Sequence, residues 1–501
     1  MATAQVQRAS IFAIVPEDTA GTLKVVSAAT SFIPLKKGFS MSPGFEELTS
    51  DELQDDIGMT KPTVGKENPS GSHGAYLKHR GSSDFPVWSH LLLSALGTRV
   101  SRGSEYPSVS STTTVIVVSD DGNFQVGEAL FVSDLSAGYV IRNVASKVTS
   151  LEQLVLNFAM TRSIGTNSIQ KNYMIKPASS DHPSFSAWLY RANGASLEAM
   201  AGCKVNSVSI KMTSGGFVEI DFGYQGTKYF FNPINITASN KYLDFFTPQG
   251  TSTATLPEKV YRSPQELCDQ LITEMSSVNA FDTYIASFNS HGASAGKFTI
   301  ESDGTRLELL FSNGANSASS LQTALGYSGG NKTGATTYTA ANVQTYSSSL
   351  TPDYEDQDNI VAKNLDVMVG SQSDNVQRKA SSVTITVNTP NTPVDDITSE
   401  NGILENITMS REVTVTATIL LEKHEIGLFD KYVKGTGISF MVNIGPKDGA
   451  GNWVVTKTVN IYIANAVLTQ HAIGGDDIIT LELSAKGYVD TNRKDFYLNF
   501  V

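Results

Sequence analysis

Short runs of β-branched and aromatic residues, each bounded by Gly, Asn, Asp or Pro, follow one another along most of the chain. Such runs are typical of β-strands, because these side chains fit a pleated, half-buried surface. The clearest predicted strands are 112–118, 205–212, 217–224, 383–387, 413–421, 438–444, 454–463 and 478–483. The pattern therefore predicts a mainly β protein with mostly antiparallel sheets.

Three segments instead carry apolar residues at helical spacing. Ser263 is a helix-capping residue, Pro264 suits the first helical position and Glu266 completes a capping box, so a helix is predicted from 263 to 275. Segments 85–96 and 425–433 have apolar residues three to four apart, and each ends close to a glycine that can cap it. We expect one short helix in each.

One order of elements occurs twice along the chain. Residues 205–226 and 459–487 each read as a strand, a Gly-Gly turn, a second strand and a closing glycine. Upstream of each come a strand, an acidic loop, a second strand, a helix and a third strand. Hairpins with Gly-Gly turns also recur by chance, but five elements in one order favour a duplication.

The repeat divides the chain into three predicted domains. Two tandem antiparallel β-sandwich or barrel domains, each with a flanking helix, take 1–238 and 347–501, and a small β excursion interrupts the first at 120–160. Between them, 239–346 has strands and the capped helix of a complete α+β domain, including a short helix predicted at 317–325. The fold class is thus mainly β with an inserted α+β domain.

The composition narrows the function. The 501 residues carry 37 Lys and Arg against 49 Asp and Glu, a net charge of −12, which disfavours a basic clamp on nucleic acid. The two cysteines cannot build a disulfide framework or a four-ligand zinc site. No apolar run approaches the length of a membrane span, so we expect a soluble chain made in a reducing cytosol.

The sequence contains no complete catalytic or cofactor-binding motif of the common kinds. His424 and Glu425 begin a zinc-protease pattern, but Leu428 stands where the second histidine should be. The acidic stretch 353–358 lacks the glycine and glutamate of a calcium-binding loop. No nucleophile elbow, phosphate-binding loop or dinucleotide fingerprint occurs. We therefore predict no catalytic residue, no metal, no cofactor and no enzymatic activity.

Several segments together resemble a known family. They are the opening 7–21 (QRASIFAIVPEDTAG), 45–56 (FEELTSDELQDD), 71–80 (GSHGAYLKHR), 188–194 (WLYRANG) and the hairpin 201–226. In this order they resemble the tail tube proteins of long-tailed bacteriophages, the siphophages. The likeness rests on the pattern of elements over about 350 residues rather than on one invariant motif.

The resemblance implies a structural virion protein. In this family, subunits join edge to edge into rings lined by a continuous β-sheet, the rings stack through a long hairpin loop, and DNA is ejected through the channel. Two tube domains in one chain imply a trimeric, pseudo-sixfold ring, with the inserted domain projecting outward. The implied partners are the chain itself, tape measure, terminator and distal tail proteins, and viral DNA that passes without specific binding, with no membrane; the location is the virion tail, after synthesis in the host bacterial cytoplasm.

The resemblance also assigns candidate residues. It gives the ring-stacking role to 45–74 and 390–409, and the candidate acidic residues in these loops are Glu46, Glu47, Asp51, Glu52, Asp55, Asp56, Asp395, Asp396 and Glu400. Acidic side chains facing a channel would repel DNA phosphates and let the duplex slide. Asp476 and Asp477 are candidate residues of this kind, although both could equally be ordinary turn residues.

Two other classes of function stay open at this point. A β-sandwich that binds a host or a carbohydrate could use the aromatic residues of 242–246 and Tyr261, although aromatics at strand spacing are more often core. A glycan hydrolase would need two carboxylates across a cleft, and the sequence offers no way to choose a pair. The preferred interpretation is a self-assembling tube protein.

Overall fold

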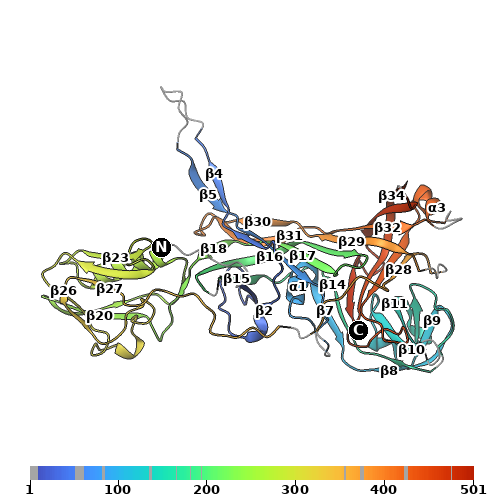
Figure 1. The fold of residues 1–501 in the computed structure, drawn as a ribbon, viewed down its shortest axis with the longest axis horizontal. Coiled ribbons are helices and arrows are strands. Elements are labelled where there is room, and N and C mark those ends of the chain that lie inside the picture. Colours follow the sequence, from blue (N-terminus) through green and yellow to red (C-terminus); the bar gives the residue numbers. More distant parts are fainter. Residues whose placement is uncertain are drawn as a thin grey trace. The chain divides into compact units, whose positions relative to one another are not determined.

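The computed structural model describes most of the chain, and its elements are mainly β-strands, as predicted (Figure 1). The described residues are 10–50, 61–79, 81, 85–134, 138–164, 166–180, 182–192, 194–354, 357–372, 377–421, 427–475 and 477–501. The chain divides into two compact units. The first comprises 1–13, 186–201 and 228–351, and the second comprises 14–185, 202–227 and 352–501.

An antiparallel sheet of eight strands forms the centre of the second unit. The register pairs give the order β3, β6, β17, β16, β29, β32, β35, β34. Their bounds are Ser40–Ser42, Ser70–Tyr76, Glu219–Gln225, Ser196–Thr213, Ala380–Asn388, Glu412–Leu420, Thr480–Tyr488 and Val459–Gly474. Side chains alternate along these strands between a buried apolar face and a more exposed polar face, as expected of a sheet with one covered side.

A second sheet covers that apolar face. Its strands are β7 (Gly97–Arg102), β14 (Asn172–Pro177), β36 (Tyr497–Phe500), the first half of β34, β33 (Ile438–Ile444) and β28 (Asp366–Gly370). Between the two sheets, the ring of Trp88 lies 6.5 Å from that of Phe222 on β17 and 5.8 Å from that of Phe500 on β36. The core of this unit therefore lies between two sheets that share the long strand β34.

Matching irregularities mark β16–β17 and β34–β35 as two copies of one hairpin. The register of β16 against β17 shifts between Val205 and Ser207, and that of β34 against β35 shifts between Leu468 and Gln470. Each shift adds one residue to the first strand of the hairpin, as in a β-bulge. Because the bulge lies at the equivalent position in both hairpins, it aligns β16 with β34 and β17 with β35 residue by residue.

The strands before each hairpin follow the same alignment. On β3, Met41 stands opposite Gly71 of β6, and on β29, Ile385 stands opposite Val415 of β32. The two residues of each pair are equally far apart in sequence. β6 then pairs with β17 as β32 pairs with β35. The structure thus contains one four-stranded motif twice. The strand 112–118, which the sequence predicted as part of the first copy, instead belongs to the barrel that interrupts this copy.

Each copy carries one helix between its second and third strands. These helices are α1 (Ser89–Leu96) and α3 (Gly427–Lys434), and both end at a glycine with positive φ, Gly97 at 94° and Gly435 at 60°. The prediction that the first helix begins at 85 was wrong by four residues, because Pro86 starts a turn that precedes it. Residues 425 and 426 of the second prediction lie outside the described residues.

A closed barrel of six strands interrupts the first copy between β7 and β14. Its strands are β8 (Tyr106–Ser111), β9 (Val115–Val118), β10 (Ala129–Asp134), β11 (Gly138–Val148), β12 (Gln153–Leu156) and β13 (Ser168–Ile169), with short 3-10 turns at Asp121–Asn123 and Thr149–Leu151. The barrel is larger than the excursion predicted at 120–160. The predicted strand 112–118 begins only at 115, because the Thr112 hydroxyl accepts a hydrogen bond from the Val115 N–H in a turn.

The first unit holds the α+β elements around their own core. β20 (Tyr242–Thr247) and β23 (Tyr284–Asn289) belong to a four-stranded and a three-stranded sheet, and α2 (Pro264–Val278) begins at its Ser263 cap as predicted. The helix predicted at 317–325 was wrong beyond a single 3-10 turn, Ser317–Ser319. Phe245 and Tyr261, considered for a sugar site, are buried in this core. The other strands are β18 (Lys228–Phe231), β19 (Ile234–Asn235), β21 (Gly250–Thr255), β22 (Val260–Tyr261), β24 (Lys297–Ser302), β25 (Leu307–Leu309), β26 (Lys332–Ala335) and β27 (Thr337–Thr339).

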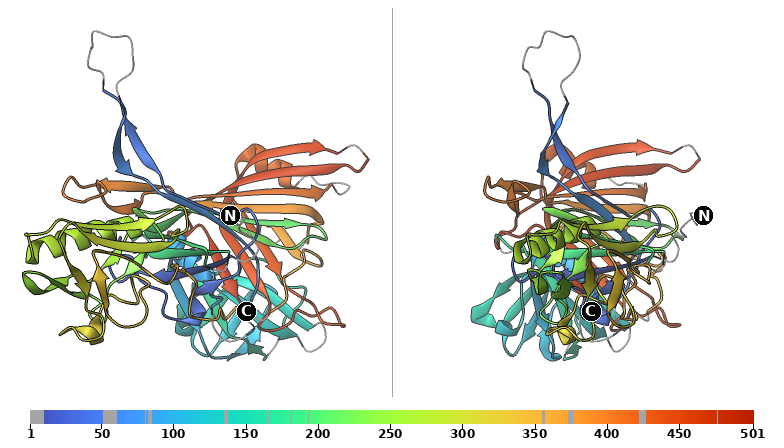
Figure 2. Two further views of the ribbon diagram at one scale, coloured as in Figure 1. Left: turned by 60° about the vertical axis from the view of Figure 1, so that its left-hand side comes forward. Right: turned by 90° about the vertical axis from the view of Figure 1, so that its left-hand side faces the viewer.

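Two hairpins leave the ends of the eight-stranded sheet, one in each copy. β4 (Phe45–Leu48) and β5 (Thr63–Glu67) extend away from that sheet in every view (Figures 1 and 2). β30 (Asn391–Asp395) and β31 (Ile403–Thr408) form the second hairpin. The remaining elements are β1 (Ile11–Pro16), the 3-10 turn Ala29–Ser31, β2 (Phe32–Ile33) and β15 (Phe185–Arg191).

Candidate assembly surfaces

The two copies meet inside the chain through a strand junction. β16 ends the first copy and pairs with β29, which begins the second, over seven register pairs from Ser207 opposite Asn388 to Thr213 opposite Ser382. At its centre Ile210 stands opposite Ile385, and both side chains are buried. The edge strand of the first copy thus pairs with the edge strand of the second copy, and the sheet continues across the junction.

The same two strand types are left at the outer edges of the sheet. In the described part of the chain, β34 beyond Ala466 pairs only with β35, and β3 pairs only with β6. The shared bulge aligns Ile473 of β34 with Ile210 of β16. Ile210 is 1% exposed, whereas Ile473 is 65% exposed. An apolar side chain that the junction covers in the first copy is therefore uncovered in the second.

The helix of the first copy is mostly buried, whereas the helix of the second copy is mostly exposed. Six of the eight residues of α1 are buried, but in α3 only Leu428 is. The exposed side chains of α3 include Phe429 and Val433. The ring of His471 on β34 lies 5.4 Å from that of Phe429 and 6.0 Å from that of Tyr432, so α3 packs beside the free edge. An apolar helix surface borders an unpaired strand.

The β4–β5 hairpin, which we call the arm, exposes both acidic and apolar side chains to solvent. Glu46 and Glu47 are exposed on β4, and so are the apolar Phe45, Leu48 and Val64. Of the other acids predicted for this loop, Asp51, Glu52, Asp55 and Asp56 lie outside the described residues. The described part of the arm is a two-stranded ribbon with little of its own core, a structure that is marginal without a partner.

The β30–β31 hairpin is tied to the sheet instead. The side-chain amide of Asn406 donates to the Gly226 carbonyl at 3.1 Å, and that of Asn391 donates to the Lys204 carbonyl at 3.0 Å. The hairpins also meet each other, because Lys66 on β5 forms a 2.7 Å ion pair with Asp395 on β30. This hydrogen bond raises the pKa of Lys66. No local signal in the sequence predicts this contact between two loops that lie far apart along the chain.

The other predicted acids lie in turns. Asp396 follows β30, and hydrogen bonds from the hydroxyl and backbone N–H of Thr398 hold its pKa below the usual range. Glu400 is exposed in the same turn. Asp477 is exposed in the turn between β34 and β35, and Asp476 lies outside the described residues. Their assignment to ring stacking or to a channel stays a prediction.

The polar face of the eight-stranded sheet is rich in hydroxyl groups. Directly opposed rows across the strands include Ser72, Ser207, Ser209, Ser382, Thr384, Thr386, Thr414, Thr416, Thr418 and Ser484. Three acids on this face have lysine partners: Asp221 with Lys211 at 2.7 Å, Glu412 with Lys486 at 2.5 Å and Glu219 with Lys36 at 2.5 Å. A fourth, Glu482, stands opposite Thr418 and is exposed. This surface is polar and close to locally neutral.

A known protein family matches most of the chain. Residues 7–367 match the family described as phage tail tube protein. The chain belongs to this family. The match includes the arm, the barrel and the first copy of the tube motif, whereas the strands β29 to β35 lie beyond it and are identified as a second copy by their bulge and spacing. No curated protein matches the chain. Of the helices in the described residues, none has the length and apolar character needed to cross a membrane.

A buried ion pair anchors the barrel of this tail tube protein. Arg102 at the end of β7 binds Glu128 and donates to the carbonyls of Ser104 and Gln170, one on each connection between barrel and sheet. Burial raises the pKa of Glu128, while the charge of Arg102 opposes that shift. The guanidinium of Arg102 therefore binds both segments that connect the inserted barrel to the sheet.

Buried asparagines join the barrel to the second sheet, including the strand β34 that both sheets share. The side chain of Asn143 on β11 exchanges hydrogen bonds with that of Asn460 on β34, which also donates to Asn443 on β33. Asn499 on β36 donates to Asn460 and accepts from Asn172 on β14. All five side chains are buried, where unmet hydrogen bonds are costly. The network fixes how these strands align.

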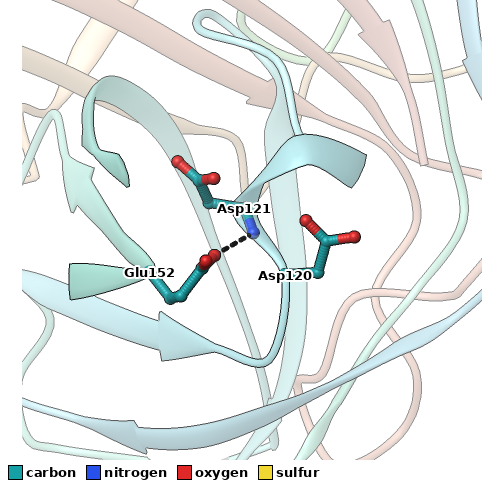
Figure 3. A group of neighbouring side chains, drawn as sticks. All are labelled: Asp120, Asp121 and Glu152. Atoms are coloured by element: carbon teal, nitrogen blue, oxygen red, sulfur yellow. Dashed lines mark hydrogen bonds between the residues drawn. The ribbon is translucent and has the colours of Figure 1, made fainter. Parts of the chain in front are cut away.

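One cluster of acidic residues in the tail tube protein was not predicted from the sequence. Asp120, Asp121 and Glu152 come together at the barrel, with oxygens within 4.8 Å of one another (Figure 3). Glu152 accepts from the Asp121 N–H at 2.6 Å, Asp120 accepts from the Gly122 N–H, and Asp121 accepts from the Thr149 hydroxyl. Backbone capping of two short turns accounts for this arrangement, and these bonds are what hold the three acids together.

Proposed function

We propose that the chain assembles into closed rings of three subunits, which stack into the tube through which genomic DNA passes into the host. The observation that carries the proposal is the β16–β29 junction. It joins the end of one copy to the start of the next, and the chain leaves the same two strand types unpaired at its edges. A second chain can repeat the junction head to tail, and such a heterologous contact forms a ring when the rotation closes.

The duplication predicts the register of this contact. Ile210 corresponds to Ile473 and Ile385 corresponds to Met41, so Ile473 of one chain should stand opposite Met41 of the next. By the same alignment Ala472 faces Ser42. The exposed Ile473 would then be covered as Ile210 is within the chain. Burying such a side chain contributes roughly 1.5–3 kcal/mol, in addition to the strand hydrogen bonds.

The ring size follows from the family resemblance and the copy number. Each chain supplies eight strands, four from each copy, and three chains supply six copies of the motif in a pseudo-sixfold arrangement. The hydroxyl face of the sheet is the proposed wall of the channel. Because three lysines and three acids of this face are paired and Glu482 adds one further negative charge, DNA would slide over a hydrated surface of low net charge rather than be held by cations. Tape measure, terminator and distal tail proteins remain the proposed further partners.

Disulfide trapping tests both the register and the ring size. The variant with Ala472→Cys and Ser42→Cys places two thiols across the proposed junction, where facing Cα atoms of antiparallel strands suit a disulfide. The native cysteines, Cys203 and Cys268, are buried, so the background should be low. On a non-reducing gel we expect covalent products that end at three chains.

A matched control separates register from proximity. Pairing Ala472→Cys with Ser40→Cys moves one thiol two residues along β3, and this variant should cross-link far less. Products that end at six chains would overturn the trimer but keep the edge contact. Equal cross-linking in both variants, or none in either, would overturn the proposed contact itself.

A further inference from the structure

We infer that a basic groove at the far end of the eight-stranded sheet receives the arm of a second copy of this chain in the next ring. The inference rests on the proposed function, because it concerns how rings of one polarity stack. In a closed ring every subunit points the same way, so stacking brings one end of the sheet against the other end in the neighbouring ring.

The arm and the groove lie at opposite ends of the same strands. The arm leaves β3 after Ser42 and returns to β6 at Ser70, which stands opposite Gln225 on β17. The groove lies at the other end, where the β16–β17 turn meets the start of β29 at Ser382. Seven residues of β6 separate these ends, a length of roughly 20 Å. The two surfaces therefore cannot meet within one chain but can meet between stacked rings.

The groove can take a few side chains of a partner, and its wall is cationic. Its volume is about 380 Å³, and Met212 and Ser214 line one side. Lys363, Arg378 and Lys379 contribute three cationic side chains to its wall. Lys363 and Lys379 are exposed at the surface. Several positive charges gathered in one concave site favour an acidic partner.

The arm offers the matching chemistry. Glu46 and Glu47 project as exposed carboxylates on β4, flanked by the exposed apolar Phe45. The groove has an apolar neighbour too: Phe217 is exposed and forms a backbone bridge with Val361, which precedes the lining residue Ala362. Carboxylates would meet cations while the aromatic ring of Phe45 meets an apolar rim. The sequence of the whole loop 45–56 is acidic, which agrees with this polarity.

Charge reversal tests the contact. The variant with Glu46→Lys and Glu47→Lys should still form rings, but their mean number per tube should fall about tenfold, because several arms per ring lose their partners together. Lys363→Glu with Lys379→Glu should shorten tubes similarly. Combining all four substitutions exchanges the charges across the contact and should restore most of the length. Ring number per tube is counted by negative-stain electron microscopy.

Controls keep this inference separate from the proposed function. Asp269→Lys with Glu301→Lys makes the same charge change at exposed acids of the first unit and should leave tube length unchanged. If the native chain forms no rings, the proposed function fails. If rings and tubes form but neither charge reversal shortens the tubes, this inference alone is overturned. The same holds if the variant with all four substitutions forms tubes no longer than those of the two reversals.

Discussion

A buried histidine should make the tube sheet unstable in mild acid. His73 on β6 is 1% exposed, and its ring lies 6.5 Å from that of Phe222 in the apolar core. Burial lowers the pKa of His73 to about 3 from its usual value near 6.5. The folded chain therefore keeps this imidazole neutral well below the pH at which an exposed histidine takes up a proton.

The size of the effect follows from linkage. The unfolded chain binds a proton at His73 near pH 6.5, whereas the folded chain does so only near pH 3. Folding stability is fully present above about pH 6.5 and falls as the pH drops toward 3, by about 1.4 kcal/mol per pH unit. Between pH 7 and pH 5 the loss from His73 is about 2 kcal/mol. Burial also lowers the pKa of His79 to about 4, which adds a similar loss.

Substitution of His73 isolates its share. His73→Phe keeps a planar ring against Phe222 but cannot take up a proton, so this variant should lose about 2 kcal/mol less than the native chain between pH 7 and pH 5. Hydrogen exchange of peptides from β6 and β17 measures the local opening free energy at both pH values. His291→Gln, at an exposed position, is the control and should behave like the native chain.

One outcome would refute the reasoning. If His73→Phe and the native chain lose the same opening free energy between pH 7 and pH 5, then protonation of His73 does not drive the acid sensitivity. A uniform loss across both units, rather than a loss concentrated in β6 and β17, would point to the overall charge instead.

Three further results are expected. Glu128→Leu should cost about 3–5 kcal/mol of unfolding free energy in a denaturant titration because it leaves Arg102 buried without its anion, and adding Arg102→Met should recover most of this loss. Gly127→Ala should lower stability by about 3 kcal/mol in the same assay, because Gly127 has φ of 86° and an added Cβ would lie 2.1 Å from the ring of Tyr497. Replacing 49–62 by a two-residue turn should leave rings that do not stack, and long tubes in electron micrographs of this variant would contradict the role of the arm.

The sequence predicted best those elements whose signals are local. The strand 438–444 was found with its observed bounds, because its β-branched and aromatic run is closed by glycines at 437 and 445. The helix after Ser263 was found because its cap, proline and glutamate act within one turn. The order of the duplicated elements could also be read, since each copy repeats the same local signals.

Contacts between distant parts of the chain could not be read in this way. β8 and β13 close the barrel with few strongly apolar residues, and only their partners make them strands. The ion pair of Lys66 with Asp395 and the tethering of β30–β31 depend on where the fold brings the two hairpins. The acids at 46, 47 and 395 were therefore predicted as one class, although the structure gives them different surroundings.

The position of β36 bears on how the protein is made. This strand lies between β14 and β34 and pairs with both, yet it follows β14 by most of the chain. During synthesis the edge of β14 must wait, open to wrong partners, while the inserted unit and the second copy are translated. Only then can β36 close the second sheet and the asparagine network through Asn499. Subunits should thus become competent to join a ring only after translation has passed β36, which would keep half-made chains on neighbouring ribosomes from joining.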